Sequence, residues 1–447
     1  MFKRYLLLIV LLVSLTTQAQ NAEARFGKLM SESRWFDLAR ELKVTPTDSV
    51  TPLLRQMAVA LTHHYFNRPD SACIVLNDLL SQHAQELGSN TLSMATLLGV
   101  NLARTNHYAE AVGLVQSLYD QLTAQGVDST QTAVYRTLAK QWTALAFYAP
   151  LFRPLHPAED YRIPMIIDDR TDQHALLMDG AINNRESQLL FDTGAGYNII
   201  SSQQARDHGL RLLGIDMPMA GIGMQTGHYA IADTLRIGGM AWTNVPFLIV
   251  DMQTGHARAD SIGRMLPPVI GRPVMQCMQE IQMDFAHREF IIPATPTPNP
   301  LDESNLMQTD SEGLRLATTD EKGKPLYFHL DTGGYYTTLL PRWYQMHRAE
   351  VEATGTPDTL RIAGVGGIAI TRSYTLRDHP FRIGSGTAVL DSVSVDTGIG
   401  LTDGQPTAPA YLSGEEDGTL GLDLLERFPR VILNLKEMYL EAIPSQP

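Results

Sequence analysis

Two aspartates in this chain stand where their carboxylates could work together. Residues 189–194 read Leu-Leu-Phe-Asp-Thr-Gly, and residues 328–333 read Phe-His-Leu-Asp-Thr-Gly. A short run of β-forming residues predicts a buried strand, and the glycine lets the backbone turn at once, so Asp192 and Asp331 are each expected at a strand end. Two carboxylates a few ångströms apart cannot both ionise cheaply, so the pair would retain one proton. The ionised partner could then activate a water while the protonated partner polarises a carbonyl group.

The sequence around these aspartates predicts a series of strands and turns that would position them. A proline-rich stretch, residues 293–300, reads as an extended linker because proline cannot donate to a sheet ladder. On each side of it strands and a turn lead to one aspartate. The expected elements are strands at 162–167, 175–182 and 314–317, turns at Asn183-Asn184 and Lys322-Gly323, and the strands that end at Asp192 and Asp331.

The two halves also match in their order of motifs. Each Asp-Thr-Gly is followed by a glycine-rich patch, at 221–223 and at 364–367, and then by an apolar pair before glycine, at 269–271 and 419–421. Asp284 and Asn434 stand at the same separation from those last glycines. Chance would not usually keep this register, so the sequence predicts an internal duplication.

These residues resemble the aspartic peptidases, and among them the bacterial retropepsin-like group, with two lobes in one chain from about Arg162 to Ala442. The resemblance implies that Asp192 and Asp331 are the catalytic pair of a peptide-hydrolysing enzyme. It implies supporting roles around this pair for Thr193, Gly194, Thr332 and Gly333. The threonines would link the two turns across the lobes, and the glycines would let backbone N–H groups approach the carboxylates. No cofactor and no metal is implied.

The same resemblance makes the glycine-rich patches flap candidates, because a lid over a peptide must open and close. The candidate residues are Gly221, Gly223, Gly364 and Gly366. One flap in each lobe is closer to a fused retropepsin pair than to pepsin, although plain hairpins remain an alternative. Tyr229 could belong to a lid or pocket wall, but an aromatic residue near strands is more often core.

Two places depart from this pattern. Asp396-Thr397-Gly398 is a third copy of the motif, preceded by residues that are only partly apolar, and we expect a surface turn there. After the apolar-apolar-Gly segment the second lobe has an acidic residue, Asp423, where the first lobe has Pro273.

The region before the lobes is predicted to be helical. Residues 1–19 have a basic start, a short apolar run and small residues at a plausible cleavage point, which indicates a secretory signal and a periplasmic or secreted protein. Residues 24–150 show apolar spacing of three and four, and Ala39, Ala72 and Ala111 recur at nearly the period of tetratricopeptide helix pairs. A generic helical bundle remains an alternative. Such helix pairs could dock a partner protein.

The predicted architecture is therefore multidomain α and β: an α-helical, tetratricopeptide-like domain (24–150) followed by an all-β bilobed acid-protease fold. The lobes are expected at 161–293 and 303–447, joined by a linker at 294–302. The net charge of -13 argues against nucleic acid as a partner. After signal removal we expect no membrane span, and a peptide or protein as substrate. Cys73 and Cys277 read as buried thiols, although an oxidising compartment would permit a bridge.

Two alternatives to a peptidase stay open at this point. The lobes could have kept the fold without turnover, leaving an envelope scaffold that binds through its helical repeats. Alternatively, each lobe could pair with a second chain, which predicts a wide separation of Asp192 and Asp331 within one chain.

Overall fold

The computed structural model describes residues 17–148, 151–154, 158–170, 173–310, 312–402, 405–406 and 414–444. The chain divides into two compact units, residues 1–149 and 150–447. The expected signal peptide lies outside the described residues, except for residues 17–19, which begin helix α1. Among the described residues, no helix has both the length and the apolar character that a membrane crossing requires.

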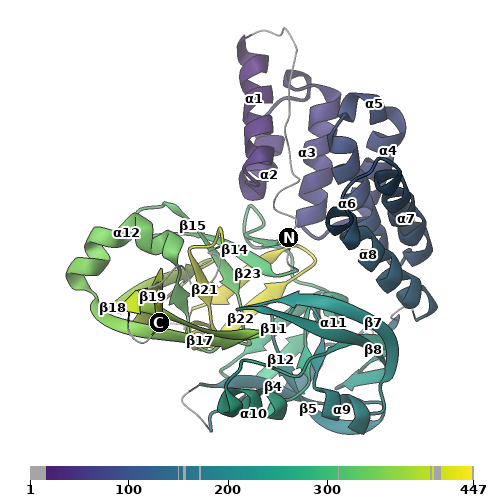
Figure 1. Ribbon diagram of the computed structural model, residues 1–447. Coiled ribbons are helices and arrows are strands. Elements are labelled where there is room, and N and C mark those ends of the chain that lie inside the picture. Colours follow the sequence, from purple (N-terminus) through teal and green to yellow (C-terminus); the bar gives the residue numbers. More distant parts are fainter. Residues whose placement is uncertain are drawn as a thin grey trace. The chain divides into compact units, whose positions relative to one another are not determined.

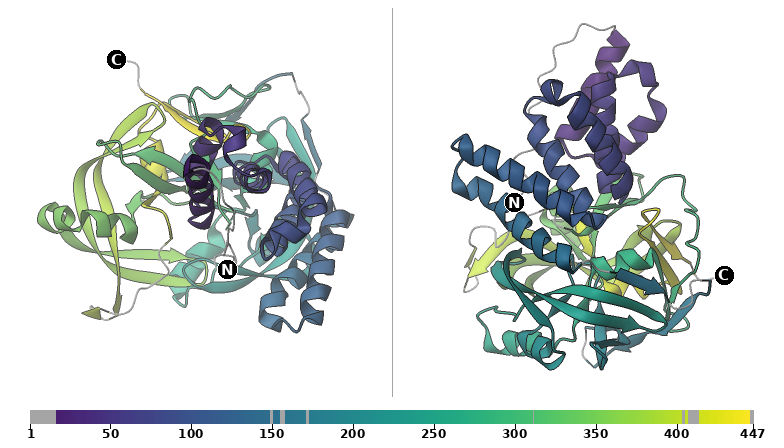
Figure 2. Two further views of the ribbon diagram at one scale, coloured as in Figure 1. Left: turned by 90° about the horizontal axis from the view of Figure 1, so that it is seen from above. Right: turned by 90° about the vertical axis from the view of Figure 1, so that its right-hand side faces the viewer.

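The first unit is helical, and each helix packs against its neighbours in sequence (Figures 1 and 2). Its elements are α1 (Thr17–Ser31), α2 (Trp35–Val44), the 3₁₀ turn η1 (Thr47–Ser49), α3 (Pro52–Tyr65), α4 (Pro69–Gln82), α5 (Ala84–Leu87), α6 (Asn90–Arg104), α7 (Tyr108–Ala124) and α8 (Ser129–Phe147).

Three turns of this unit have the same geometry. After α1, α3 and α6 the chain passes through a residue with positive φ, and the next residue donates its N–H to the carbonyl five positions back. This bond satisfies a carbonyl that the helix end would leave open. The positive-φ residues are Ser33 (54°), Asn67 (53°) and Asn106 (62°). Helices α2, α4 and α7 begin two residues later, where the sequence repeats were noted.

The second unit is built mainly of strands, which form three sheets within the described residues. The first lobe contains β1 (Leu151–Pro154), β3 (Ile166–Asp168), β4 (Ala175–Ile182), β5 (Arg185–Phe191), β6 (Ile199–Ile200), α9 (Ser202–Asp207), β7 (Arg211–Ala220), β8 (Met224–Ile237), β9 (Met240–Ile249), α10 (Ala257–Met265), β10 (Val269–Ile270) and α11 (Arg272–Met278). The second lobe contains β13 (Leu306–Gln308), β14 (Leu314–Thr319), β15 (Pro325–Leu330), β16 (Thr338–Leu339), α12 (Pro341–Thr354), β17 (Thr356–Gly364), β18 (Gly367–Ile383), β19 (Gly386–Thr402), β20 (Gln405–Pro406), β21 (Gly418–Leu420) and α13 (Leu422–Leu425).

The two lobes repeat one topology. In the first, β10 runs parallel to β5 and antiparallel to β6, and β6 runs parallel to β9. In the second, β21 runs parallel to β15 and antiparallel to β16, and β16 runs parallel to β19. The helical region followed by two duplicated β lobes confirms the predicted fold class.

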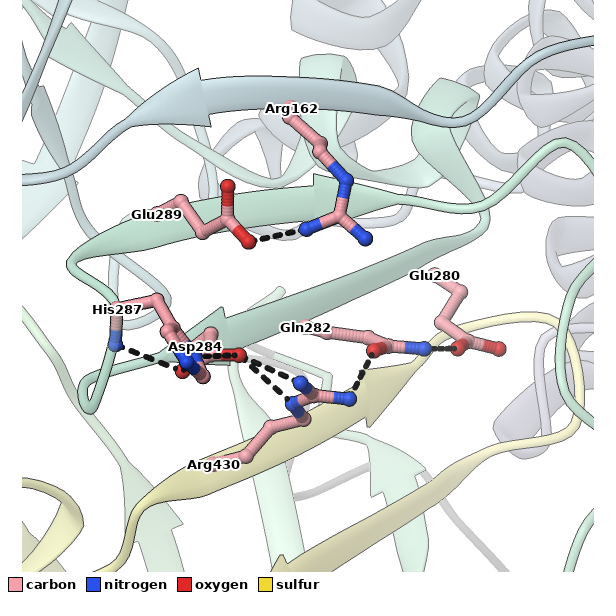
Figure 3. Close-up of polar contacts among 7 residues, drawn as sticks. All are labelled: Arg162, Glu280, Gln282, Asp284, His287, Glu289 and Arg430. Carbon is pink, nitrogen blue, oxygen red and sulfur yellow. Dashed lines mark hydrogen bonds and ion pairs between the residues drawn. The ribbon is translucent and has the colours of Figure 1, made fainter.

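A five-stranded sheet joins the lobes and is called the central sheet here. Its order is β2 (Tyr161–Pro164), β12 (Glu289–Ile292), β11 (Glu280–Asp284), β22 (Arg430–Asn434) and β23 (Tyr439–Ile443). Strands β11 and β22 come from different lobes and pair antiparallel. The buried Asp284 of β11 is paired with Arg430 of β22 (Figure 3). Arg430 Nη2 lies 2.5 Å from Asp284 Oδ2, and the His287 backbone N–H donates to Asp284 at 3.0 Å.

The third Asp-Thr-Gly motif corrects one expectation. Asp396 is fully buried inside β19, where its carboxylate accepts the Gly398 N–H at 2.8 Å. Thr397 donates to the Arg372 carbonyl on the neighbouring strand β18 at 2.7 Å. The strand continues past the motif because Gly398 adopts a positive φ of 74°, so the predicted surface turn is wrong.

Candidate active site

Each aspartate of the pair directly follows its strand, as β5 ends at Phe191 and β15 ends at Leu330. Phe191 and Leu330 are fully buried, which fixes both strand ends in the core. The Asp192 N–H donates to the Ile270 carbonyl at 3.2 Å, and the Asp331 N–H makes the equivalent hydrogen bond to a carbonyl of β21. Both aspartates keep partial exposure, so a water or substrate can reach them.

The backbone that follows each aspartate supplies donors to its carboxylate. The N–H groups of Gly194 and Ala195 donate to Asp192 Oδ1 at 2.8 and 3.1 Å. In the second lobe, the N–H groups of Gly333 and Gly334 donate to Asp331 Oδ1 at 3.0 and 3.1 Å. Each turn thus fixes one carboxylate oxygen and leaves the other free for chemistry.

The two turns are linked by a reciprocal set of buried hydrogen bonds. The Thr193 N–H donates to Thr332 Oγ1, and the Thr332 N–H donates to Thr193 Oγ1, both at 3.0 Å. Each hydroxyl in turn donates into the opposite lobe, Thr193 to the Leu330 carbonyl at 3.1 Å and Thr332 to the Phe191 carbonyl at 2.9 Å. These four bonds hold both turns in register.

The glycines of the two turns bring the carboxylates together. A Cβ on Gly194 would lie 2.6 Å from Asp331 Oδ1 and 3.2 Å from Asp192 Oδ1, so both carboxylates approach one point. A Cβ on Gly333 would lie 2.6 Å from Asp192 Oδ1. Glycine is required at both positions because any side chain would overlap the opposite carboxylate.

The pair keeps a proton at neutral pH. Burial first, and then the Asp331 charge, raise the pKa of Asp192 to about 8, against the lowering effect of the Gly194 N–H. A hydrogen bond between the two carboxyl groups also raises this pKa. The titration belongs to the pair rather than to either residue. Because the aspartates meet within one chain, the wide separation expected for lobes that each pair with a second chain is contradicted.

The glycine-rich patches form the tips of two hairpins, called the flap hairpins here: β7 with β8, and β17 with β18. The tips touch, because the Gly223 N–H donates to the Val365 carbonyl at 3.0 Å. A Cβ on Gly221 would lie 2.8 Å from the same carbonyl oxygen, and a Cβ on Gly364 would lie 3.2 Å from Ile222. Gly366 has a positive φ of 78°, which the tight second tip requires.

Equivalent positions of the two lobes meet at three places: the threonines beside the aspartates, strands β11 and β22, and the hairpin tips. Contacts between equivalent positions lie on the axis that relates the lobes. The aspartates and the hairpin tips therefore share one approximate two-fold axis. Tyr229 is 3% exposed within β8, as expected of a core residue, and packs against Tyr197.

The lobes differ in the contacts made by the residue that accepts the glycine N–H. In the second lobe Thr337 accepts the Gly421 N–H, and Asp423 accepts the Thr337 N–H at 2.9 Å and its hydroxyl at 2.6 Å. In the first lobe, which has Pro273 in place of the acid, Asn198 Oδ1 accepts the Gly271 N–H and Asn198 Nδ2 donates to the Pro246 carbonyl, each at 3.0 Å.

Two further links between the lobes were not anticipated from the sequence. Arg272, on α11 of the first lobe, forms an ion pair with Glu312 and donates to the Gly313 carbonyl at 3.1 Å. His174, just before β4, lies 3.0 Å from Glu426 of the second lobe. The only sequence signal was that Arg272 directly follows an apolar-apolar-Gly segment, and nothing local marks a partner so distant in the chain.

Other chemistry finds no comparable support in the residues that the structure describes. No three His, Cys, Asp or Glu side chains there are arranged to hold a metal ion. Cys73 and Cys277 are free thiols and lie in different units.

Comparison with known proteins finds a matching family for part of the second unit. A family profile described as aspartyl protease matches residues 178–273. No curated protein matches. Among solved structures the chain is similar to an aspartic proteinase from Irpex lacteus, with 12% identity, a TM-score of 0.37, and coverage of 64% of this chain and 98% of that one. It is also similar to Basic 7S globulin from soybean, with 12% identity, a TM-score of 0.37, and coverage of 64% and 94%.

The family profile covers the strand and turn that present Asp192. Residues 178–273 are therefore an aspartyl-protease-like region.

Proposed function

We propose that this chain is an aspartic endopeptidase whose catalytic pair is Asp192 and Asp331. The observation that carries the proposal is the convergence of the two carboxyl groups on one point, with a shared hydrogen bond and an Asp192 pKa raised to about 8. This arrangement is the one that aspartic peptidases need.

The mechanism follows from the pair's single proton. The ionised carboxylate takes a proton from a water held between the aspartates, and the protonated carboxyl donates to the carbonyl oxygen of the peptide bond. Water attacks the carbonyl carbon, and a carboxyl group then protonates the departing amine. The N–H groups of Gly194 and Gly333 each bind Oδ1 of one carboxylate, so the orientation of the second oxygen is fixed as well.

The flap hairpins are proposed to close over the bound peptide. Their tips meet through backbone atoms and glycines, so opening needs little more than the loss of the Gly223 to Val365 hydrogen bond and of the contact made by Ile222. We further propose that the helical unit is tetratricopeptide-like and docks a protein partner. The repeated turns at Ser33, Asn67 and Asn106 support that proposal.

A secreted or periplasmic location is proposed from residues 1–19 alone. A fusion of these residues to a reporter that works only after export tests it, with residues 1–4 removed as the control. Export of the control at the same level would contradict the proposal, since the basic start would then be unnecessary.

The peptidase proposal is tested by digesting a peptide library from acid to neutral pH with the full chain and analysing the products by mass spectrometry. Asp192→Asn should abolish cleavage. A matched control is Asp396→Asn, which changes the same tripeptide elsewhere and keeps an oxygen for the Gly398 N–H. Normal cleavage by Asp192→Asn would refute a catalytic role of Asp192, and no cleavage by the unaltered chain at any pH would favour a scaffold that has lost turnover.

A further inference from the structure

One imidazole joins the lobes beside the turn that carries Asp331. His174, from the first lobe, packs its ring against the ring of Tyr335 in the second lobe, with the ring centroids 4.7 Å apart and the planes tilted by 41°. Its Nδ1 also lies 3.0 Å from a carboxylate oxygen of Glu426, just after α13. The His174 and Glu426 side chains are 31% and 18% exposed, so the ion pair is largely shielded from water.

Both partners of His174 are tied to the Asp331 turn. The Tyr335 carbonyl accepts the Asp423 N–H at 2.9 Å, and the Gly334 carbonyl accepts the Leu422 N–H at 3.0 Å, so α13 begins on the turn itself. Glu426 follows the other end of this short helix. A displacement of Glu426 or Tyr335 would therefore also displace the residues that directly follow Asp331.

The first lobe has an equivalent brace made with a permanent charge. The Arg272 N–H donates to the Ala195 carbonyl at 3.0 Å, which ties α11 to the turn of Asp192. The Arg272 guanidinium, 2% exposed, then reaches Glu312 of the second lobe. Each aspartate turn is thus braced across the lobes by a cation from the first lobe and a carboxylate from the second. Arginine stays charged at every relevant pH, whereas histidine does not.

We propose that His174 is a positioning residue, which holds the Asp331 turn in place through Tyr335 and Glu426. The proposal rests on the proposed peptidase function for its catalytic consequence, but its structural consequence can be measured without activity.

Charged groups surround the brace. Burial raises the pKa of Glu426, while His174 and Arg288 lower it and Asp423 raises it, and the net shift is upward. The contact with His174 therefore offsets part of the cost of burying the Glu426 carboxylate. The remaining charged or titratable groups described around the brace are Tyr335, Tyr336 and Arg427.

Hydrogen exchange of the full chain tests the structural consequence. Peptides from 326–340 report the Asp331 turn, and peptides from 187–200, braced by Arg272, are the internal control. In His174→Gln, measured at one pH, protection of 326–340 should fall by roughly threefold to tenfold more than that of 187–200. His174→Arg keeps a cation for Glu426 and should lose less protection in 326–340. An equal change of the two turns in His174→Gln would overturn the proposal.

A comparison of kcat with KM tests the catalytic consequence. His174→Gln should lower kcat more than it raises KM, because a loosened Asp331 turn misplaces one carboxyl group of the pair, and His174→Arg should restore part of kcat. Glu426→Gln should resemble His174→Gln, because it removes the carboxylate that contacts His174. An unchanged kcat in His174→Gln would overturn the catalytic role. Failure of every form to cleave peptides would instead refute the peptidase proposal and leave the exchange result standing.

Discussion

Removing one hydroxyl between the lobes should weaken the two-lobed unit by an amount that the hydrogen bonds predict. Thr332→Val keeps the shape of the side chain but deletes Oγ1, which accepts the Thr193 N–H and donates to the Phe191 carbonyl. Thr332 is 1% exposed, so water cannot replace the lost partner. Leaving a buried polar group unpaired costs about 1–3 kcal/mol, and two groups are affected, so we expect a loss of roughly 2–4 kcal/mol after partial relaxation.

Native-state hydrogen exchange measures this loss in the lobes alone. Amides of β11 and β22 open only when the central sheet separates, so they report the two-lobed unit and not the helical one. Since about 1.4 kcal/mol is a factor of ten, their protection should fall about thirtyfold or more in Thr332→Val. Thr332→Ser keeps the hydroxyl and is the control, with a much smaller change expected. Unchanged protection in Thr332→Val would refute the view that these bonds hold the lobes together.

Three other predictions follow from the same contacts. Gly333→Ala places a Cβ 2.6 Å from Asp192 Oδ1 and should lower kcat/KM by about a hundredfold while far-ultraviolet circular dichroism stays unchanged; a loss under about threefold would contradict the close approach. Because burial and the Asp331 charge raise the pKa of Asp192 to about 8, the unaltered chain should lose activity as pH rises through that value in a pH-rate profile, and activity that persists to about pH 10 would argue against the shared proton. Arg430→Gln leaves the buried Asp284 with less countercharge and should destabilise the two-lobed unit by roughly 1–2 kcal/mol in urea at neutral pH, whereas no change would mean that the pair contributes nothing.

The stability that the ion pair of Asp284 and Arg430 contributes also depends on pH. Burial raises the pKa of Asp284, but hydrogen bonds from His287 and the Arg430 guanidinium outweigh it, so the net shift is downward. A lowered carboxyl pKa gives stability that is present above the unfolded value of about 3.9 and is lost as pH falls through the folded value. The contribution of Arg430 should therefore disappear in strong acid.

Local pattern was enough to predict the elements that deliver the aspartates. The strand Ala175–Ile182 and the turn Asn183-Asn184 appear as expected, the turn residues having φ of 50° and 61°. The reason is that strand alternation and turn chemistry act over a few residues. The motif order predicted the duplicated lobes in the same way, because each copy repeats its local signals.

The contacts across the lobes could not be predicted in this way. The Arg272 and His174 braces join residues far apart in sequence, and a salt bridge leaves no periodic signal in either segment. The role of Asn198 was hidden for the same reason, since the Pro246 carbonyl that its side chain contacts can be found only in three dimensions. Asp396 was misplaced because Gly398 permits a strand to continue where a turn was expected.

The measurement that tests the central claim most directly is a double-mutant cycle on kcat/KM with Asp192→Asn, Asp331→Asn and the double variant. Two carboxyl groups that share one proton act as a unit, so each single change should reduce cleavage to the same background as the double change. If either single variant keeps a normal rate, or if the two losses simply multiply, the aspartates do not act together and the account is contradicted.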